Sequence, residues 1–293
     1  MKQKRGFRNK YRQGMPFPER LVKDVRSFAA DLASRISNKG KLPVIVAWPD
    51  YPSKKTTIYK IARQLKMRLT NKPLSGAAVY LFFEDATEKS QITNNEISSL
   101  GKVLNARCAD ISKRKVDAVL QDVFGFNTFI DPRTFQGTAV EKSDANAMHD
   151  GRYVECPLQD LKDGAIYQRI IDNKTEEGFA LDYRVAVIGS QIAVVYAKYK
   201  KWDVRFTNEV VLSRLLDPLS VFSTIEQANI LKFCQKMEVD FCELDILKDN
   251  NDGRSYIIDV NTTPYGPPAG LPPIDVATSV ALLADAFKQN FVI

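Results

Sequence analysis

Three side chains with oxygen donors stand close together in the last fifth of the sequence, in a stretch that predicts a β-hairpin. They are Asp245 on a first apolar strand, and Asp259 and Asn261 on a second. Both strands are rich in apolar, β-branched and aromatic residues, and Asn251-Asp252-Gly253 between them is typical of a turn. Carboxylate and amide oxygens suit Mg²⁺, which completes its shell with water and phosphate oxygens.

The predicted hairpin brings these donors to one face. If the turn is a three-residue loop with its glycine in the left-handed region, Asn250 pairs with Arg254, and counting outward places Asp245 directly opposite Asp259. Asn261 follows on the same face, because side chains repeat every second residue along a strand.

Two unpaired carboxylates on one face are unfavourable unless a cation or a set of donors compensates them. The alternative is a solvent-facing hairpin whose polar residues lie on its wet side. The stiff loop from Thr262 to Gly270 favours the metal site, since a plain edge strand does not require such a loop.

These strands and the loop resemble the metal-binding hairpin of the ATP-grasp superfamily. The matching stretches are Glu243-Leu244-Asp245-Ile246-Leu247 and, after a short Asp-Gly turn, Ile258-Asp259-Val260-Asn261-Thr262-Thr263-Pro264. Families there carry an Asp on the first strand, and an acidic residue, any residue and Asn on the second. The resemblance implies a mixed α/β and α+β chain in which two lobes hold ATP, with D-alanine–D-alanine ligase and RimK-like enzymes as distant relatives. It covers roughly residues 110 to 290.

Length and composition are those of a globular protein with two or three subdomains. The chain has 293 residues, of which 44% are hydrophobic and 26% charged. No apolar run approaches the roughly 20 residues that span a bilayer, and no apolar segment follows the basic N-terminus, so we expect no membrane span, no secretory signal and a cytoplasmic location. The four cysteines are widely spaced without a CxxC pair, which argues against a zinc site and a disulfide framework.

The net charge of +7 has a local origin. Six Lys or Arg residues lie within the first twelve positions, and we interpret residues 1–18 as a basic flexible tail. No recognised nucleic-acid module accompanies the tail, so we do not expect nucleic-acid binding.

Residues 19–109 predict a Rossmann-like domain. Apolar residues at helical spacing predict a helix from Glu19 to Ile36, and a strand, a helix and a strand are predicted over Leu42–Trp48, Thr56–Arg68 and Ala77–Phe83. Near-continuous apolar strands in this order indicate a parallel sheet covered on both faces. The stretch from Pro52 to Thr57 superficially resembles a phosphate-binding loop, but it lacks the necessary glycines.

Residues 110–165 match the lid subdomain of the superfamily. A helix is predicted from Asp110 through Val123, followed by a strand over Phe124–Pro132. The resemblance implies that Lys113, in the first turn of this helix, reaches the phosphates of ATP. Taken alone, a lysine at that position is usually a surface residue.

A short predicted strand ends on Lys142 and enters a polar loop closed by Gly151. This pattern is similar to the strand lysine and the phosphate-covering loop of ATP-grasp enzymes, in which the ammonium holds a phosphate and the loop excludes water. The loop departs from the usual Gly/Ser-rich form and carries His149, the only histidine. A single histidine is more often incidental, but its place in the predicted lid indicates a contact with phosphate or substrate.

Residues 166–293 match the C-terminal lobe. The resemblance implies that Gln168, in place of the more frequent Glu, and the backbone of Ile171 recognise adenine. Asp182 and Arg184 lie two apart on a predicted strand that would face the ribose and phosphates, and Arg184 would stabilise a transferring phosphoryl group or an acyl phosphate. Without the neighbouring motifs, these two residues would simply be the wet face of an apolar strand. Helices are predicted from Pro218 to Gln235 and from Ala277 to Phe291.

Together these parts imply an ATP- and Mg²⁺-dependent carboxylate-amine ligase. Mg²⁺, or Mn²⁺ in its place, would be held by Asp245, Asp259 and Asn261 and would bridge the phosphates. The expected partners are a small-molecule carboxylate and an amine derived from an amino acid, a peptide or a sugar, and a homodimer is left open. The alternatives are an ATP-grasp kinase that phosphorylates a hydroxyl and a non-catalytic ATP-binding protein.

Overall fold

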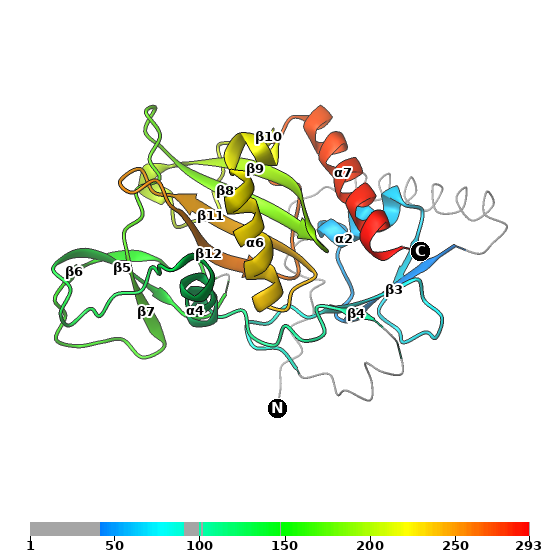
Figure 1. Ribbon diagram of the computed structural model, residues 1–293, viewed down its shortest axis with the longest axis horizontal. Coiled ribbons are helices and arrows are strands. Elements are labelled where there is room, and N and C mark those ends of the chain that lie inside the picture. Colours follow the sequence, from blue (N-terminus) through cyan, green and yellow to red (C-terminus); the bar gives the residue numbers. More distant parts are fainter. Residues whose placement is uncertain (1–41, 91–99, 101, 147, 293) are drawn as a thin grey trace, which may run out of the picture.

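The computed structural model describes residues 42–90, 100, 102–146 and 148–292, and three sheets follow one another along this part of the chain (Figure 1). The predicted tail over 1–18 and the predicted helix over 19–36 lie outside the described residues. Among the described residues, no helix is both long and apolar enough to cross a membrane.

The first sheet is parallel and has four strands in the order β2-β1-β3-β4. Its elements are β1 (Val44–Pro49), α2 (Thr57–Gln64), β2 (Arg68–Thr70), β3 (Val79–Phe83) and β4 (Val103–Leu104). The predicted strands and helix are present, but the helix ends at Gln64 and the chain enters β2, a short strand that was not predicted. The Rossmann-like description of this segment stays a prediction.

The second sheet is antiparallel and has three strands in the order β6-β5-β7. Helix α4 (Lys113–Phe124) precedes β5 (Gly137–Ser143), β6 (Arg152–Cys156) and β7 (Ala165–Arg169). Because β7 pairs with β5, this sheet continues past residue 165, where the sequence suggested a boundary.

The strand predicted over Phe124–Pro132 is wrong. This segment forms only an isolated bridge between Phe129 and Gln168. The Asp117 carboxylate accepts hydrogen bonds from the amide and the hydroxyl of Thr128, at 2.7 and 2.6 Å. A side chain therefore satisfies backbone groups that a strand would have used in a ladder.

The third sheet is antiparallel and has five strands in the order β10-β9-β8-β11-β12. The strands are β8 (Phe179–Ile188), β9 (Gln191–Lys201), β10 (Leu212–Leu216), β11 (Phe241–Lys248) and β12 (Ser255–Asn261), and a 3₁₀ turn (Trp202–Val204) follows β9. We call it the central sheet, because in Figure 1 it lies between the other two.

Three helices accompany the central sheet, namely α5 (Pro218–Val221), α6 (Thr224–Lys236) and α7 (Pro273–Phe291). The single helix predicted over 218–235 is wrong, since it breaks into α5 and α6. Ser223 caps the second helix by accepting a hydrogen bond from the Glu226 amide, while the Glu226 carboxylate accepts one from the Ser223 amide. This capping box starts a new helix inside the apolar pattern.

The hairpin of β11 and β12 pairs Asp245 with Asp259, as predicted. The turn itself differs from the prediction, since Asp249 rather than Asn250 pairs with Arg254. A bulge between Asp245 and Ile246 restores the register, because β12 carries one additional residue there. The shift at the turn and the bulge thus offset each other, and Asp245 still pairs with Asp259.

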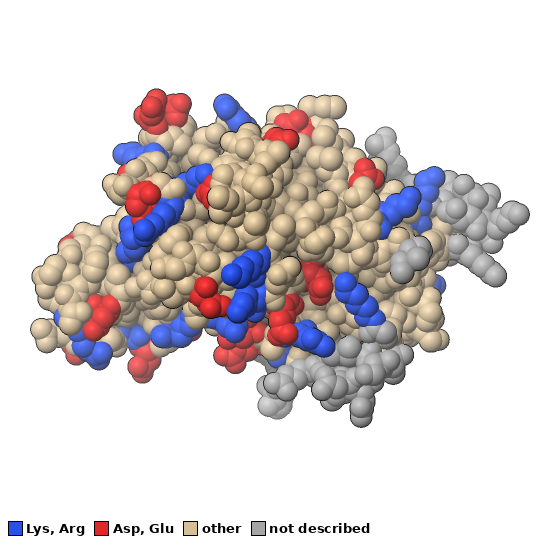
Figure 2. Space-filling view, viewed as in Figure 1, with Lys and Arg blue, Asp and Glu red and all other residues tan. Residues whose placement is uncertain are grey.

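Two apolar clusters cover the two faces of the central sheet. Val185 and Leu244 belong to the cluster that includes α4 and α6. Ala186 and Phe241, from the same two strands, point to the other side and pack with α2, α7 and the parallel sheet. Charged side chains are distributed differently, since Lys and Arg are interspersed with Asp and Glu on the face shown in Figure 2 and form no continuous basic surface there.

Candidate active site

A cavity of about 140 Å³ lies where the three-stranded sheet meets the central sheet. Eight of the ten site residues predicted from the sequence line it, and they are Lys113, Lys142, His149, Gln168, Ile171, Asp182, Asp245 and Asp259. Arg184 is not part of the lining but bonds to Asp245. Asn261 is also outside the lining, and it follows Asp259 on the same face of β12.

Asp245 is fully compensated by neighbouring cations. Arg184 donates to both of its oxygens, from Nε and Nη2, each at 3.1 Å, and Lys198 Nζ lies 2.9 Å from Oδ1. Although desolvation opposes the effect, the charges of Arg184 and Lys198 hold the pKa of Asp245 far below its usual range. Asp245 is therefore ionised at every physiological pH.

Asp259, directly opposite, has no comparable compensation. Within the described part of the chain, its side chain accepts a hydrogen bond only from the adjacent Val260 amide, at 3.2 Å. Burial raises the pKa of Asp259 to about 6, against the opposing effect of the Lys113 charge. A half-buried carboxylate in this condition is a group that a bound cation would stabilise.

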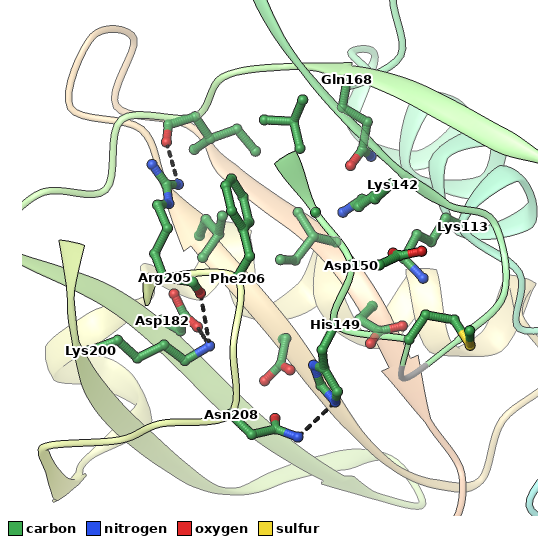
Figure 3. A pocket seen from close by; sticks show the side chains of 18 of the residues that line it. Lys113, Lys142, His149, Asp150, Gln168, Asp182, Lys200, Arg205, Phe206 and Asn208 are labelled. Atoms are coloured by element: carbon green, nitrogen blue, oxygen red, sulfur yellow. Dashed lines mark hydrogen bonds and ion pairs between the residues drawn. The ribbon is translucent and has the colours of Figure 1, made fainter. Parts of the chain in front are cut away.

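The two predicted phosphate lysines approach the cavity from one side (Figure 3). Lys113 Nζ donates to the carbonyl of Ala145, at 2.6 Å, which ties the first turn of α4 to the loop after β5. Burial, followed by the charge of Lys113, lowers the pKa of Lys142 to about 8. The two positive charges repel each other, and an anion bound between them would relieve this repulsion.

The groups predicted to recognise the base and the ribose carry bonds within the chain. The carbonyl of Ile171 accepts from Arg205 Nη2 at 2.9 Å, and Asp182 forms an ion pair with Lys200 at 2.8 Å. The guanidinium of Arg205 lies over the ring of Trp202, 4.3 Å from its centroid. Gln168 donates to Thr128 Oγ1, so adenine recognition by this strand stays a prediction.

His149 joins the loop after β5 to the loop that follows β9. Its Nε2 lies 2.7 Å from the Nδ2 of Asn208, as Figure 3 shows, and burial followed by the charge of Lys200 lowers the pKa of the imidazole. The neutral ring therefore accepts a hydrogen bond from the Asn208 amide. Next to it, a Cβ on Gly151 would lie 2.9 Å from the ring of Phe206, which packs edge-on against Tyr153.

Twelve further residues line the cavity beyond the predicted ones, and five of them come from β9 and the loop after it, namely Lys198, Lys200, Arg205, Phe206 and Asn208. Two of them carried a signal, since Lys198 and Lys200 alternate with tyrosines at the end of an otherwise apolar strand. The other three follow a 3₁₀ turn and have no periodicity that could have indicated a position.

The donors present fit a magnesium site. Asp245 and Asp259 face each other across β11 and β12, and Asn261 Oδ1 accepts from the Thr263 amide at 2.9 Å, which orients the side chain. Among the described residues, no group of three or more His, Cys, Asp and Glu could hold a metal. Two carboxylates and one amide suit an ion that takes its remaining ligands from water and phosphate oxygens.

Comparison with known proteins rests on structure, because no family model matches the sequence and no curated protein is similar to it in sequence. ATP-grasp ligase PsnB complexed with minimal precursor, Mg and ADP superposes with a TM-score of 0.55 at 14% identity, over 84% of this chain and 98% of that chain. The same ligase complexed with precursor peptide PsnA2 and AMPPNP gives 0.53 at 13% identity, over 84% and 98%.

D-Alanine–D-alanine ligase from Bacillus anthracis superposes with a TM-score of 0.52 at 13% identity, over 85% of this chain and 96% of that chain. These similarities extend over nearly the whole length of each solved structure, while the identities are low. They confirm the predicted fold class, and the chain therefore has the ATP-grasp fold.

Proposed function

We propose that this chain is an ATP- and Mg²⁺-dependent ligase that activates a carboxylate as an acyl phosphate and joins it to an amine. The observation that carries the proposal is the pairing of Asp245 with Asp259 across two strands, in one cavity with Lys113 and Lys142. Paired oxygen ligands beside buried lysines suit a metal nucleotide. The fold supports the proposal, since the ligases with which it superposes share it.

Each residue then has a role that follows from its position. Lys113 and Lys142 would hold phosphate oxygens as point charges. Arg184, whose guanidinium already binds Asp245, would stand beside the transferring phosphoryl group and stabilise its charge. Asp245, Asp259 and Asn261 would hold Mg²⁺, which when bound neutralises phosphate charge during transfer.

Nucleotide binding requires the cavity to open. Its volume of about 140 Å³ is below the roughly 300–1,000 Å³ of ordinary ligand sites. Two hydrogen bonds join residues of its lining, one between His149 and Asn208 and one between Arg205 and the Ile171 carbonyl. We expect these contacts to exchange for contacts with the nucleotide, after which the lid excludes water from the acyl phosphate.

The names of the solved structures support a proposal for the substrates only at the level of chemical class. PsnB is complexed with precursor peptides, and D-alanine–D-alanine ligase joins amino acids by name. For this chain we propose a carboxylate and an amine of the amino-acid, peptide or sugar-derived class, with a cytoplasmic location and Mn²⁺ as an alternative metal.

The proposal is tested by a screen for ADP release with Mg·ATP and paired carboxylates and amines, namely amino acids, short peptides and sugar acids. Mass spectrometry of the products then identifies the reaction class. An amide product supports the ligase, and a stable phosphoester would replace it with the kinase. Tight Mg·ATP binding without turnover across the whole panel would replace it with a non-catalytic ATP-binding protein.

A further inference from the structure

Glu243 is a fully buried carboxylate that the proposed chemistry does not use. It precedes Asp245 by two residues on β11 and therefore points to the same face of the central sheet, opposite Asn261. Only 1% of its surface is exposed, so it does not line the cavity. An ionisable side chain at such a position is costly unless its neighbours satisfy it.

The two oxygens of Glu243 differ in what they contact. Oε1 accepts a hydrogen bond from the hydroxyl of Thr57 at 3.0 Å. Oε2 is buried and has no hydrogen-bond partner among the residues that the structure describes, and it lies 3.7 Å from Arg184 Nε. That nitrogen donates to Asp245 Oδ1 at 3.1 Å instead. The guanidinium of Arg184 thus lies between two carboxylates: it donates hydrogen bonds to Asp245 and forms a longer ion pair with Glu243.

Metal binding would change which of the two carboxylates accepts the hydrogen bonds of Arg184. A dication that takes the oxygens of Asp245 removes the acceptors that Arg184 now uses, and buried donors without acceptors are costly. Glu243 Oε2 is the adjacent acceptor with free capacity. A shift of a few tenths of an ångström would bring Arg184 Nε within hydrogen-bond distance of it.

We propose that Glu243 is a positioning residue. It would accept a hydrogen bond from Arg184 when Asp245 binds the metal, so that the guanidinium stays in place beside the phosphoryl group. This inference rests on the proposed function and adds a residue that the superfamily pattern used above does not include. Without Glu243, Arg184 would remain on Asp245 and compete with the metal for it.

The surroundings hold Glu243 firmly enough for this role. Thr57 is the first residue of α2, and its amide donates to the carbonyl of Pro264 at 2.8 Å. A Cβ on Gly266 would lie only 2.5 Å from Glu243 Oε1 and 2.8 Å from Thr57 Oγ1, so the loop after β12 closes directly over the carboxylate. Lys60 adds a bond to the carbonyl of Gly266. From its position on β11, Glu243 therefore contacts both α2 and the loop after β12.

Binding of AMPPNP, measured by calorimetry in Mg²⁺ and in EDTA, tests the inference without turnover. Glu243→Gln keeps the shape but weakens the hold on Arg184, and we expect Mg²⁺-supported affinity to fall roughly 10-fold or more while affinity in EDTA stays within about two-fold. Thr57→Val, which only frees Oε1, should show a smaller loss of the same kind. If Glu243→Gln does not fold, Thr57→Val alone decides between the outcomes.

Two matched controls separate this effect from loss of a buried polar group. Glu141→Gln removes another buried carboxylate, which bonds to Arg152 and Tyr167, and Thr56→Val removes a buried hydroxyl that bonds to Ser53. Neither should change the ratio of the affinities in Mg²⁺ and EDTA.

A double mutant gives the sharpest outcome. In an Arg184→Met background there is no guanidinium to hold, so adding Glu243→Gln should cause no further loss of Mg²⁺-supported affinity. An unchanged ratio in Glu243→Gln, or the same loss with and without Arg184, would overturn the positioning role and leave the proposed function standing. Failure of the wild type to bind AMPPNP in Mg²⁺ would overturn both.

Discussion

Next to the cavity, the two faces of the central sheet carry different kinds of buried side chain. On one face, Val185 and Leu244 are completely buried against α4 and α6. On the other, their neighbours Arg184 and Asp245 carry opposite charges and bond to each other. Because side chains alternate along a strand, consecutive residues of β8 and β11 serve a stable core and a reactive site.

Next to the cavity, one face of the sheet is therefore apolar and the other is charged, although farther along β8 and β11 the second face is also apolar, at Ala186 and Phe241. Around the cavity, burial raises the pKa of Asp259 to about 6, and burial lowers the pKa of Lys142, on the neighbouring strand β5, to about 8. Unbalanced groups of this kind are typical of sites that bind charged ligands. Substitutions on the two faces should therefore separate stability from activity.

The largest effect is expected from the metal ligands. Asp259→Asn and Asn261→Ala should each abolish Mg·ATP turnover, because each removes a ligand from a site for a dication. Neither residue belongs to the apolar clusters, so the unliganded variants should melt close to the wild type. ADP release and melting with and without Mg·ATP are the measurements. Wild-type stabilisation by Mg·ATP together with wild-type ADP release in either variant would show that the metal assignment is wrong.

Leu244→Ala is the counterpart on the apolar face. Leu244 has no exposed surface, and truncation of such a side chain costs about 2–5 kcal/mol through lost burial and a cavity. Urea unfolding should show this loss in the free energy of unfolding. At temperatures where the variant remains folded, its nucleotide affinity should match the wild type. A loss of affinity without a loss of stability would remove the distinction between the faces.

Lys142→Ala should weaken nucleotide binding by about ten-fold or more, since a charge-assisted hydrogen bond contributes roughly 1.5–3 kcal/mol. Lys142→Arg should lose less, because it keeps the charge while changing the geometry. Calorimetric titration with ATP ranks the three proteins. Equal affinity in the wild type and Lys142→Ala would place this lysine outside the nucleotide site.

A smaller effect concerns pH. The folded pKa of Lys142 is lowered to about 8, so the free protein loses this charge as pH rises through that value, and phosphate binding must then restore the proton. Affinity for ATP in EDTA should therefore fall between pH 7 and pH 9 in the wild type. Lys142→Arg, whose guanidinium keeps its proton, should show a flatter profile. Parallel profiles for the two proteins would contradict this role of the ammonium.

The sequence predicted most of what periodicity and local chemistry determine. The alternation in the hairpin placed Asp245 opposite Asp259, although the turn differs by one residue and a bulge compensates. The break at Ser223 and the loop around Thr128 were missed, because a capping box and an aspartate side chain override an apolar pattern.

Parts of the site could not be predicted because they depend on tertiary contacts. Lys198 reaches Asp245 from β9, and Arg205 reaches the Ile171 carbonyl from the loop after that strand. The free oxygen of Glu243 is visible only once Thr57 and Gly266 are packed against it. Contacts between different elements, such as these, cannot be predicted from the spacing of residues within one strand.

Anomalous diffraction from crystals grown with MnCl₂ and AMPPNP tests the central claim most directly, because it locates the metal itself. We expect a manganese peak about 2.1 Å from oxygens of Asp245 and Asp259, in contact with the nucleotide phosphates and near Asn261. We also expect Arg184 to have moved from Asp245 toward Glu243. A nucleotide bound with its metal elsewhere, and with the ion pairs of Asp245 to Arg184 and Lys198 intact, would contradict the metal assignment.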